Sequence, residues 1–115
     1  MGAMGILDFL GLGTRGSALV TDAEAEALAA RGALVLDVRS RAEWARGHCE
    51  GSLCMPMDEV PARLSELPTD RPILVGCATG ARARHVAEML RAQGYDAHVL
   101  GPWQRNPRCF AGPQD

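Results

Sequence analysis

The sequence has few of the features that mark nucleic-acid-binding or membrane-spanning proteins. Its formal net charge is only −2, and neither sign of charge forms a long run, so no electrostatic footprint for nucleic acid is present. No stretch approaches ~18 uninterrupted apolar residues, which excludes a transmembrane segment. Residues 1–16 lack both the basic start and the cleavage site of a signal peptide. We therefore expect a cytoplasmic protein.

The cysteines and histidines also lack the spacing of a zinc site. The four cysteines are Cys49, Cys54, Cys77 and Cys109. The first two are spaced C-x4-C rather than C-x2-C, and the histidines add no second ligand pair, so no metal is expected. A secreted chain with four cysteines would allow three full pairings, but a chain of 115 residues buries enough surface to fold without staples. We expect mainly reduced thiols.

The composition divides the chain into an arm, one domain and a tail. Residues 1–16 are rich in glycine and are expected to form a flexible arm, with a short amphipathic segment that docks on a partner or membrane surface as the alternative. Residues 17–104 form the domain. Residues 105–115 are rich in proline and glycine and predict an irregular tail, with Trp103 packed back onto the domain.

Strand-like and helix-like segments alternate through the domain. ALVLDV at 33–38 and PILVG at 72–76 are nearly continuous apolar runs, typical of strands covered on both faces. The other expected strands are 17–21, 51–55 and 96–100, and the expected helices are 22–31, 40–45, 58–67 and 81–93. This alternation predicts an α/β fold with a doubly wound, mainly parallel sheet and helices on both faces. Such sheets place their sites at the carboxyl ends of the strands.

Cys77 follows the second buried strand, in the stretch G-C-A-T-G-A-R. If a helix begins near Ala81, the amides of the loop and of the helix N-terminus surround the Cys77 sulfur and favour its thiolate form. Gly80 can take a positive φ, and Arg82 and Arg84 add positive charge. The alternative, a buried small residue that ends a core strand, is the commoner fate of a cysteine when this stretch is taken alone.

A second motif upstream favours the catalytic interpretation. LDVRSRAEWARGHCEGSLCMP at 36–56 resembles the signature of the rhodanese-like domain family: D-V-R, an acidic residue with an aromatic, G-H, and a small-residue turn into a proline. The loop C-A-T-G-A-R is similar to that family's loop C-x-x-G-x-R, and the separation between Asp37 and Cys77, about forty residues, is also the family's spacing. The resemblance covers the chain from Ser17 to Trp103.

The resemblance implies a sulfurtransferase that uses Cys77 as its nucleophile. In this family the cysteine takes the outer sulfur of a donor such as thiosulfate, becomes a persulfide, and passes that sulfur to cyanide or a thiol. The anion-binding loop would comprise Ala78, Thr79, Gly80, Ala81 and Arg82. The implied partners are the small donor, the thiol or cyanide acceptor, and a protein that accepts sulfur; no cofactor is needed. The alternative function is a partner-binding or sulfur-relay module with little small-molecule turnover.

The length of the loop separates sulfur transfer from a related chemistry. Related phosphatases and arsenate reductases carry C-x5-R, a wider cradle for a tetrahedral oxyanion. The separation from Cys77 to Arg82 is C-x4-R, which suits a sulfur atom better. We therefore rank phosphatase activity below sulfur transfer.

Other residues of the resemblance are expected to support the site. Asp37 and Arg39 match D-V-R and are expected to form ion pairs that fix the strand end. Glu43, Trp44 and His48 match the segment that braces the domain beside the site. His48 is expected to be a hydrogen-bonded structural histidine rather than a base for Cys77.

The roles of three further residues are less defined by the sequence. Arg84 either widens the positive field or is a solvated helix residue. Cys49 and Cys54 are expected to be buried small residues, with a resolving thiol for the site as the alternative.

Overall fold

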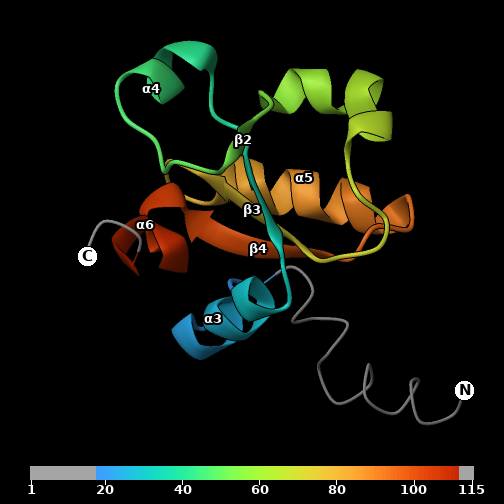
Figure 1. Ribbon diagram of the computed structural model, residues 1–115. Coiled ribbons are helices and arrows are strands. Elements are labelled where there is room, and N and C mark those ends of the chain that lie inside the picture. The colour runs from blue at the N-terminus through green and yellow to red at the C-terminus, as the bar shows by residue number, and fades with distance from the viewer. Residues whose placement is uncertain (1–17, 112–115) are drawn as a thin grey trace, which may run out of the picture.

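The computed structural model describes residues 18–111, with side chains as far as Cys109. Within this part of the chain, four strands form one sheet in the order β2-β1-β3-β4 (Figure 1). The strands are β1 Leu34–Asp37, β2 Leu53–Cys54, β3 Ile73–Cys77 and β4 Ala97–Pro102. All adjacent pairs are parallel, which confirms the predicted α/β fold with a parallel sheet.

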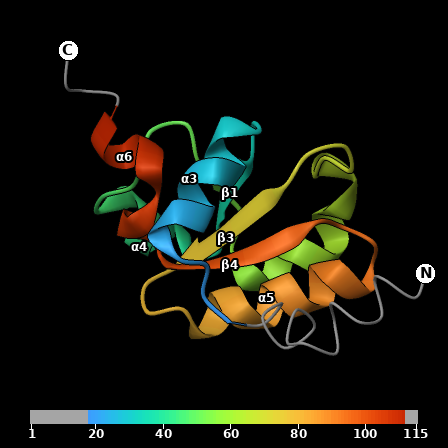
Figure 2. The same ribbon diagram turned by 90° about the horizontal axis from the view of Figure 1, so that it is seen from below.

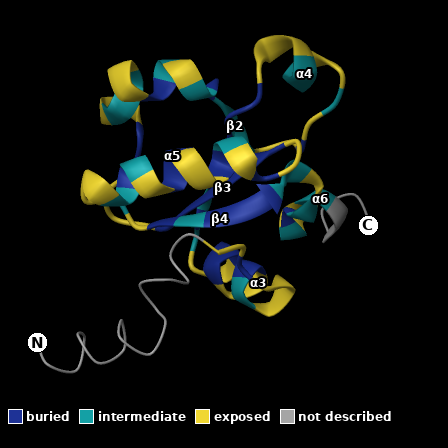
Figure 3. Ribbon diagram, turned by 180° about the vertical axis from the view of Figure 1, so that it is seen from behind, coloured by how far each residue is buried: buried dark blue, intermediate teal, exposed yellow. Residues whose placement is uncertain are grey.

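Helical segments cover both faces of this sheet (Figures 1 and 2). They are α3 Asp22–Ala30, α4 Arg41–Ala45, η2 Met57–Glu66, α5 Ala81–Ala92, η3 Trp103–Arg105 and α6 Pro107–Ala111. Helix α5 and the 3₁₀ segment η2 pack on one face, where Leu36, Val75 and Cys77 belong to the same buried cluster. Helix α3 packs on the other face, against Val35 and Leu74. The central strands are therefore buried on both faces, as their apolar runs predict (Figure 3).

Two of the expected helices begin at side-chain caps. The Thr21 hydroxyl accepts a hydrogen bond from the Glu24 backbone N–H, and the Glu24 carboxylate accepts one from the Thr21 N–H. Ser40 and Glu43 form the same reciprocal capping box at α4. Each box satisfies two backbone donors at a helix start, so both boundaries are fixed by local sequence.

The chain departs from the expected elements in two places before the tail. The expected helix 58–67 is present as η2, but it is a 3₁₀ helix with a kink at Arg63, where φ is −119°. Of the expected strand 17–21, the described residues 18–21 form a single parallel bridge, between Leu19 and Val99. The predicted arm, residues 1–16, lies outside the described residues.

The prediction of an irregular tail is wrong over residues 105–111. Arg105 ends η3, and α6 begins at Pro107 after Asn106, whose side-chain oxygen accepts a hydrogen bond from the Arg108 N–H. Asparagine before a first-turn proline is a favourable helix start, because the side chain caps a donor and proline has no N–H to satisfy. The Arg108 side chain also donates to the Ala29 carbonyl at 2.5 Å, which ties α6 to α3. Residues 112–115 lie outside the described part.

No helix among residues 18–111 is long and apolar enough to cross a membrane. The same residues contain no group of three or more histidine, cysteine, aspartate or glutamate side chains placed to hold a metal ion.

Candidate active site

The Cys77 sulfur lies where β3 ends and accepts hydrogen bonds from the backbone. The Gly80 N–H donates to it over 2.9 Å and the Ala83 N–H over 3.4 Å. Gly80 is the N-cap of α5 with φ +116°, a conformation that side chains disfavour. The sulfur therefore lies at the positive end of a helix that runs for 12 residues, an arrangement that stabilises negative charge.

The predicted anion-binding loop is brought together around this sulfur. Ala78, Thr79 and Ala81 are exposed, whereas Gly80 is buried. Cys77 itself has no exposed surface, so its sulfur becomes accessible to solvent only through a local opening of the loop or of a neighbouring side chain. The loop thus presents small uncharged side chains to solvent, and the Cys77 sulfur lies beneath them.

Arg82, the last residue of the loop, pairs with Glu43 on α4. Its two terminal nitrogens donate to the two carboxylate oxygens over 2.8 and 3.0 Å. The bond from Arg82, followed by that from the Ser40 N–H, lowers the pKa of Glu43 to about 2. The pKa of Arg82 is raised, first by its hydrogen bond to Glu43 and then by the negative charges of Glu43, Cys77 and Asp37.

The Glu43–Arg82 pair is a feature that the sequence reasoning missed. Glu43 was expected to brace the domain beside the site, but not to bind the loop arginine. The two residues are 39 positions apart, and each belongs to a different local motif. The capping box at Ser40 is the one available signal, since it fixes where the Glu43 side chain starts.

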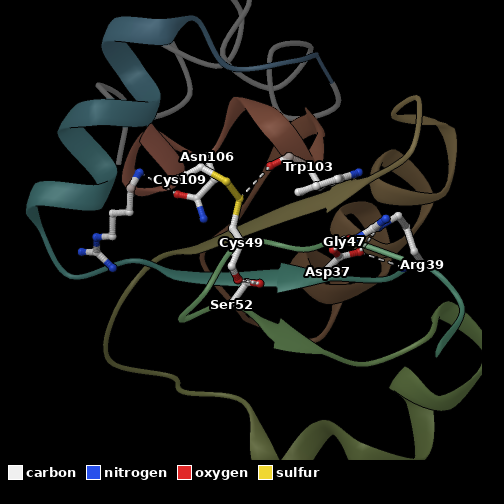
Figure 4. The surroundings of a disulfide bond; sticks show 9 residues. Asp37, Arg39, Gly47, Cys49, Ser52, Trp103, Asn106 and Cys109 are labelled. Carbon is white, nitrogen blue, oxygen red and sulfur yellow. Dashed lines mark hydrogen bonds and ion pairs between the residues drawn. A yellow bond between two sulfur atoms is a disulfide. The ribbon is translucent and has the colours of Figure 1, made fainter. Parts of the chain in front are cut away.

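Asp37 and Arg39 form the predicted ion pair, buried on the face of the sheet opposite Cys77. Arg39 Nε lies 2.9 Å from Asp37 Oδ1 and Nη2 lies 2.8 Å from Oδ2. Arg39 Nη2 also donates to the Gly47 carbonyl at 2.8 Å, and the guanidinium carbon lies 4.3 Å from the ring centroid of Trp103 (Figure 4). The side chain thus contacts the Asp37 carboxylate, the Gly47 carbonyl and the Trp103 ring, which indicates a structural role.

Cys49 and Cys109 form a disulfide beside this ion pair (Figure 4). Their Cα atoms are 5.2 Å apart although 60 positions separate them in sequence. The Cys49 sulfur lies 3.7 Å from the Trp103 carbonyl oxygen. The expectation of mainly reduced thiols is therefore wrong for this pair, because α6 carries Cys109 to the turn that holds Cys49. We call Asp37, Arg39, Trp103 and the Cys49–Cys109 disulfide the brace cluster.

Gly76 lets the brace cluster approach the strand that carries Cys77. A Cβ atom built at Gly76 would lie 3.3 Å from the Cα of Trp103 and 3.5 Å from the Gly101 oxygen. A contact of 3.3 Å to backbone is tighter than ordinary van der Waals contact, so glycine favours this close approach. The residue before Cys77 is thus closely packed against the cluster on the far side of the sheet.

Cys54 is a free thiol that lies away from the loop. It ends β2 opposite Asp37, and Asp37 in turn lies opposite Gly76. Because side chains alternate along a strand, Cys54 lies on the face of Asp37, whereas Cys77 lies on the face of α5. Burial, and after it the charge of Asp37, raises the pKa of Cys54. With Cys49 in a disulfide as well, nothing supports either cysteine as a resolving thiol.

His48 forms local contacts. Its ring stacks on Trp44 with centroids 3.7 Å apart, and its Nδ1 is hydrogen-bonded to the Trp44 carbonyl at 2.9 Å. This is the hydrogen-bonded structural histidine that the sequence predicts. Arg84 is exposed on α5, two positions beyond the loop, and its contribution to the positive field stays a prediction.

Comparison with known proteins assigns the family. Residues 21–101 match the model of the rhodanese-like domain. The chain belongs to the rhodanese-like domain family. The expected resemblance is thereby confirmed, and the match spans every element from the first turn of α3 to most of β4.

Three relatives illustrate the range of proteins that this rhodanese-like domain resembles. A sulfurtransferase of Allochromatium vinosum is 37% identical over 82 residues, which are 67% of this chain and 77% of that protein. A human single-domain sulfurtransferase, TSTD1, is 27% identical with a TM-score of 0.63, over 76% of this chain and 92% of the other. Bacillus anthracis CoADR-RHD, in its reduced form, is 30% identical with a TM-score of 0.67. The match covers 79% of this chain but only 16% of that longer one.

Proposed function

We propose that this rhodanese-like domain is a sulfurtransferase that carries a sulfane sulfur from thiosulfate to cyanide or a thiol as a Cys77 persulfide. The observation that carries the proposal is the pair of backbone N–H groups, from Gly80 and Ala83, that donate to the Cys77 sulfur at the N-terminus of α5. The relatives named as sulfurtransferases support the same reaction class.

The reaction consists of two displacements on sulfur. The Cys77 thiolate attacks the outer sulfur of thiosulfate, the S–S bond of the donor breaks, and its electron pair leaves with sulfite. The acceptor, cyanide or a thiolate, then attacks the outer sulfur of the persulfide and releases the Cys77 thiolate. Each step moves a negative charge from one sulfur to another, so the same amides stabilise the thiolate and the persulfide in turn.

The other predicted site residues take supporting roles in this proposal. Ala78, Thr79 and Ala81 form the exposed wall of the loop, Gly80 supplies the amide and the turn, and Arg82 ends the loop in its pair with Glu43. The brace cluster holds the end of β1 and approaches the residue before Cys77.

Mass spectrometry after incubation with thiosulfate tests the proposal. The intact protein should gain one sulfur atom, ~32 Da, and lose it on addition of cyanide. Cys77→Ser should abolish both the gain and the production of thiocyanate. Cys54→Ser is the matched control, because Cys54 is the other free cysteine and lies on the opposite face of the sheet. A Cys77→Ser protein that transfers sulfur at the wild-type rate would refute the proposal.

A partner-binding or sulfur-relay module is the second candidate function, and the complete burial of Cys77 favours it. A buried nucleophile reacts slowly with free small molecules unless something opens the loop, and a docking protein is one such agent. The same experiment separates the two: a persulfide that forms but passes to small acceptors far more slowly than to a protein thiol indicates a relay. Absence of any sulfur gain with several donors indicates binding alone.

A cytoplasmic location also stays a prediction. The Cys49–Cys109 disulfide counts against this prediction, because stable disulfides are common in oxidising compartments and rare in the cytosol.

A further inference from the structure

We infer that Glu43 sets the preference of the site for the charge of the sulfur donor, by neutralising Arg82 and thereby disfavouring dianionic donors. The inference rests on the proposed function and names a specificity-determining residue for it. Glu43 lies outside the loop, on α4, and reaches it only through the arginine.

The terminal N–H groups of the Arg82 guanidinium are already engaged in hydrogen bonds. Both of its terminal nitrogens already donate to Glu43, one to each oxygen, in the paired geometry that suits a carboxylate. An incoming anion therefore meets a guanidinium whose two terminal nitrogens are already hydrogen-bonded to Glu43. The rest of the loop, Ala78 to Ala81, has no charged side chain.

Two further hydrogen bonds hold Glu43 in place. One of its carboxylate oxygens also accepts the Ser40 N–H at 2.8 Å, and its backbone carbonyl accepts a hydrogen bond from Arg39 Nη1 at 3.3 Å. A sulfur donor that displaced Glu43 from Arg82 would therefore leave the carboxylate without its arginine partner, because the helix cap keeps that carboxylate in place. Binding of an anion instead has to occur with Glu43 still present.

The Arg82–Glu43 pair also determines the net charge of the site. Because the charges of Arg82 and Glu43 cancel, the negative charge of the Cys77 thiolate is offset at hydrogen-bond distance by the backbone N–H groups of Gly80 and Ala83. A dianion such as thiosulfate is repelled more strongly by this arrangement than a monoanion of the same shape. Methanethiosulfonate is such a monoanion, because a methyl group replaces one oxygen of thiosulfate. Its reaction is balanced in the same way: Cys77 takes the outer sulfur and methanesulfinate leaves with the electron pair.

The test compares these two donors on Glu43→Gln. Glutamine keeps the shape and an oxygen acceptor for Arg82 but removes the charge. The ratio of kcat/KM for thiosulfate to kcat/KM for methanethiosulfonate should rise roughly tenfold. A general effect on folding or on the Cys77 thiolate cancels in this ratio, because it acts on both donors alike.

Glu59→Gln is the matched control. Glu59 is also a paired carboxylate, but its partners are Arg41 and Arg63 rather than Arg82. The ratio should stay at the wild-type value in this variant. An unchanged ratio in Glu43→Gln, or an equal rise in both variants, would overturn the inference and leave the proposed function intact.

A salt series on the wild-type protein supplies a second measurement that needs no variant. Screening weakens repulsion between like charges, so the same ratio should rise as the ionic strength increases. A ratio that falls with salt would mean that the site attracts dianions, which overturns the inference. A wild-type protein that takes sulfur from neither donor overturns the proposed function and the inference together.

Discussion

Two sulfur centres lie near the carboxyl edge of the sheet, on opposite faces, and different forces hold them. Cys77 is a free thiol that accepts hydrogen bonds from two amides within six positions of it in the chain. Cys49 is oxidised and bonded to Cys109, with Trp103 and the buried Asp37–Arg39 pair beside it. The first centre depends on a local turn and one ion pair, whereas the brace cluster joins segments far apart in sequence.

This difference indicates that the two faces have different roles: the loop determines the chemistry and the brace cluster contributes stability. A loop of small residues around a single sulfur contributes little buried apolar surface, so changing it should alter chemistry more than stability. The brace cluster reaches the Cys77 side of the sheet through the closely fitted backbone at Gly76 and through Arg39, whose Nη1 donates to the Glu43 carbonyl. Changing it should still alter stability more than the chemistry at Cys77.

The largest stability effect is expected from Asp37→Ala. Removing the carboxylate leaves Arg39, whose side chain is 5% exposed, as a buried charge without its partner. Breaking a buried pair in this way typically costs about 3–5 kcal/mol of unfolding free energy. Urea unfolding measures the loss, and Asp70→Ala, at an exposed position, is the control with little expected change. A loss no larger than that of the control would show that the pair does not hold the face together.

A somewhat smaller loss is expected when the disulfide is removed. Cys49→Ala combined with Cys109→Ala should lower the unfolding free energy by roughly 2–4 kcal/mol, because the bond closes a long loop in the unfolded chain. The amount of Cys77 persulfide formed below the unfolding transition should stay at the wild-type level. Cys54→Ala is the control for loss of a cysteine. Loss of persulfide formation in the folded double variant would contradict the separation of the two faces.

The parts that sequence reasoning predicted are those that depend on neighbouring residues. The starts of α3 and α4, the buried strand before Cys77 and the glycine at the start of α5 each depend on signals within a few positions. They are enough to place the loop at the strand end. The same reasoning holds for α6, where Asn106 and Pro107 carry a helix-start signal that the high proline content of the tail obscured.

The parts that were missed depend on distances that no local pattern contains. A disulfide needs two Cα atoms within a few ångströms, and Cys109 had no expected position while the tail was taken as irregular. The Glu43–Arg82 pair joins two correctly predicted motifs, but their relative placement comes from how α4 and α5 meet at the sheet edge. Both misses are therefore tertiary contacts between segments that sequence reasoning located one at a time.

The smallest expected effect is a pH dependence of the unfolding free energy that arises from the Glu43–Arg82 pair. The pKa of Glu43 falls from 4.5 to about 2 in the folded protein, chiefly through the bond from Arg82. A carboxyl with a lowered folded pKa stabilises the protein above its unfolded pKa and loses that contribution as the pH falls through its folded value. The difference in unfolding free energy between wild type and Glu43→Gln should thus be constant above pH 4.5 and shrink towards pH 2.

Urea unfolding of both proteins across this range measures that difference, and the comparison removes the titration of the other carboxyl groups. Because both side chains are partly exposed, at 34% and 26%, added salt should reduce the effect. The Asp37→Ala and disulfide variants should differ from wild type without this salt sensitivity, since their contacts are buried or covalent. A wild-type advantage over Glu43→Gln that persists unchanged at pH 2 would mean that packing, rather than charge, joins α4 to the loop.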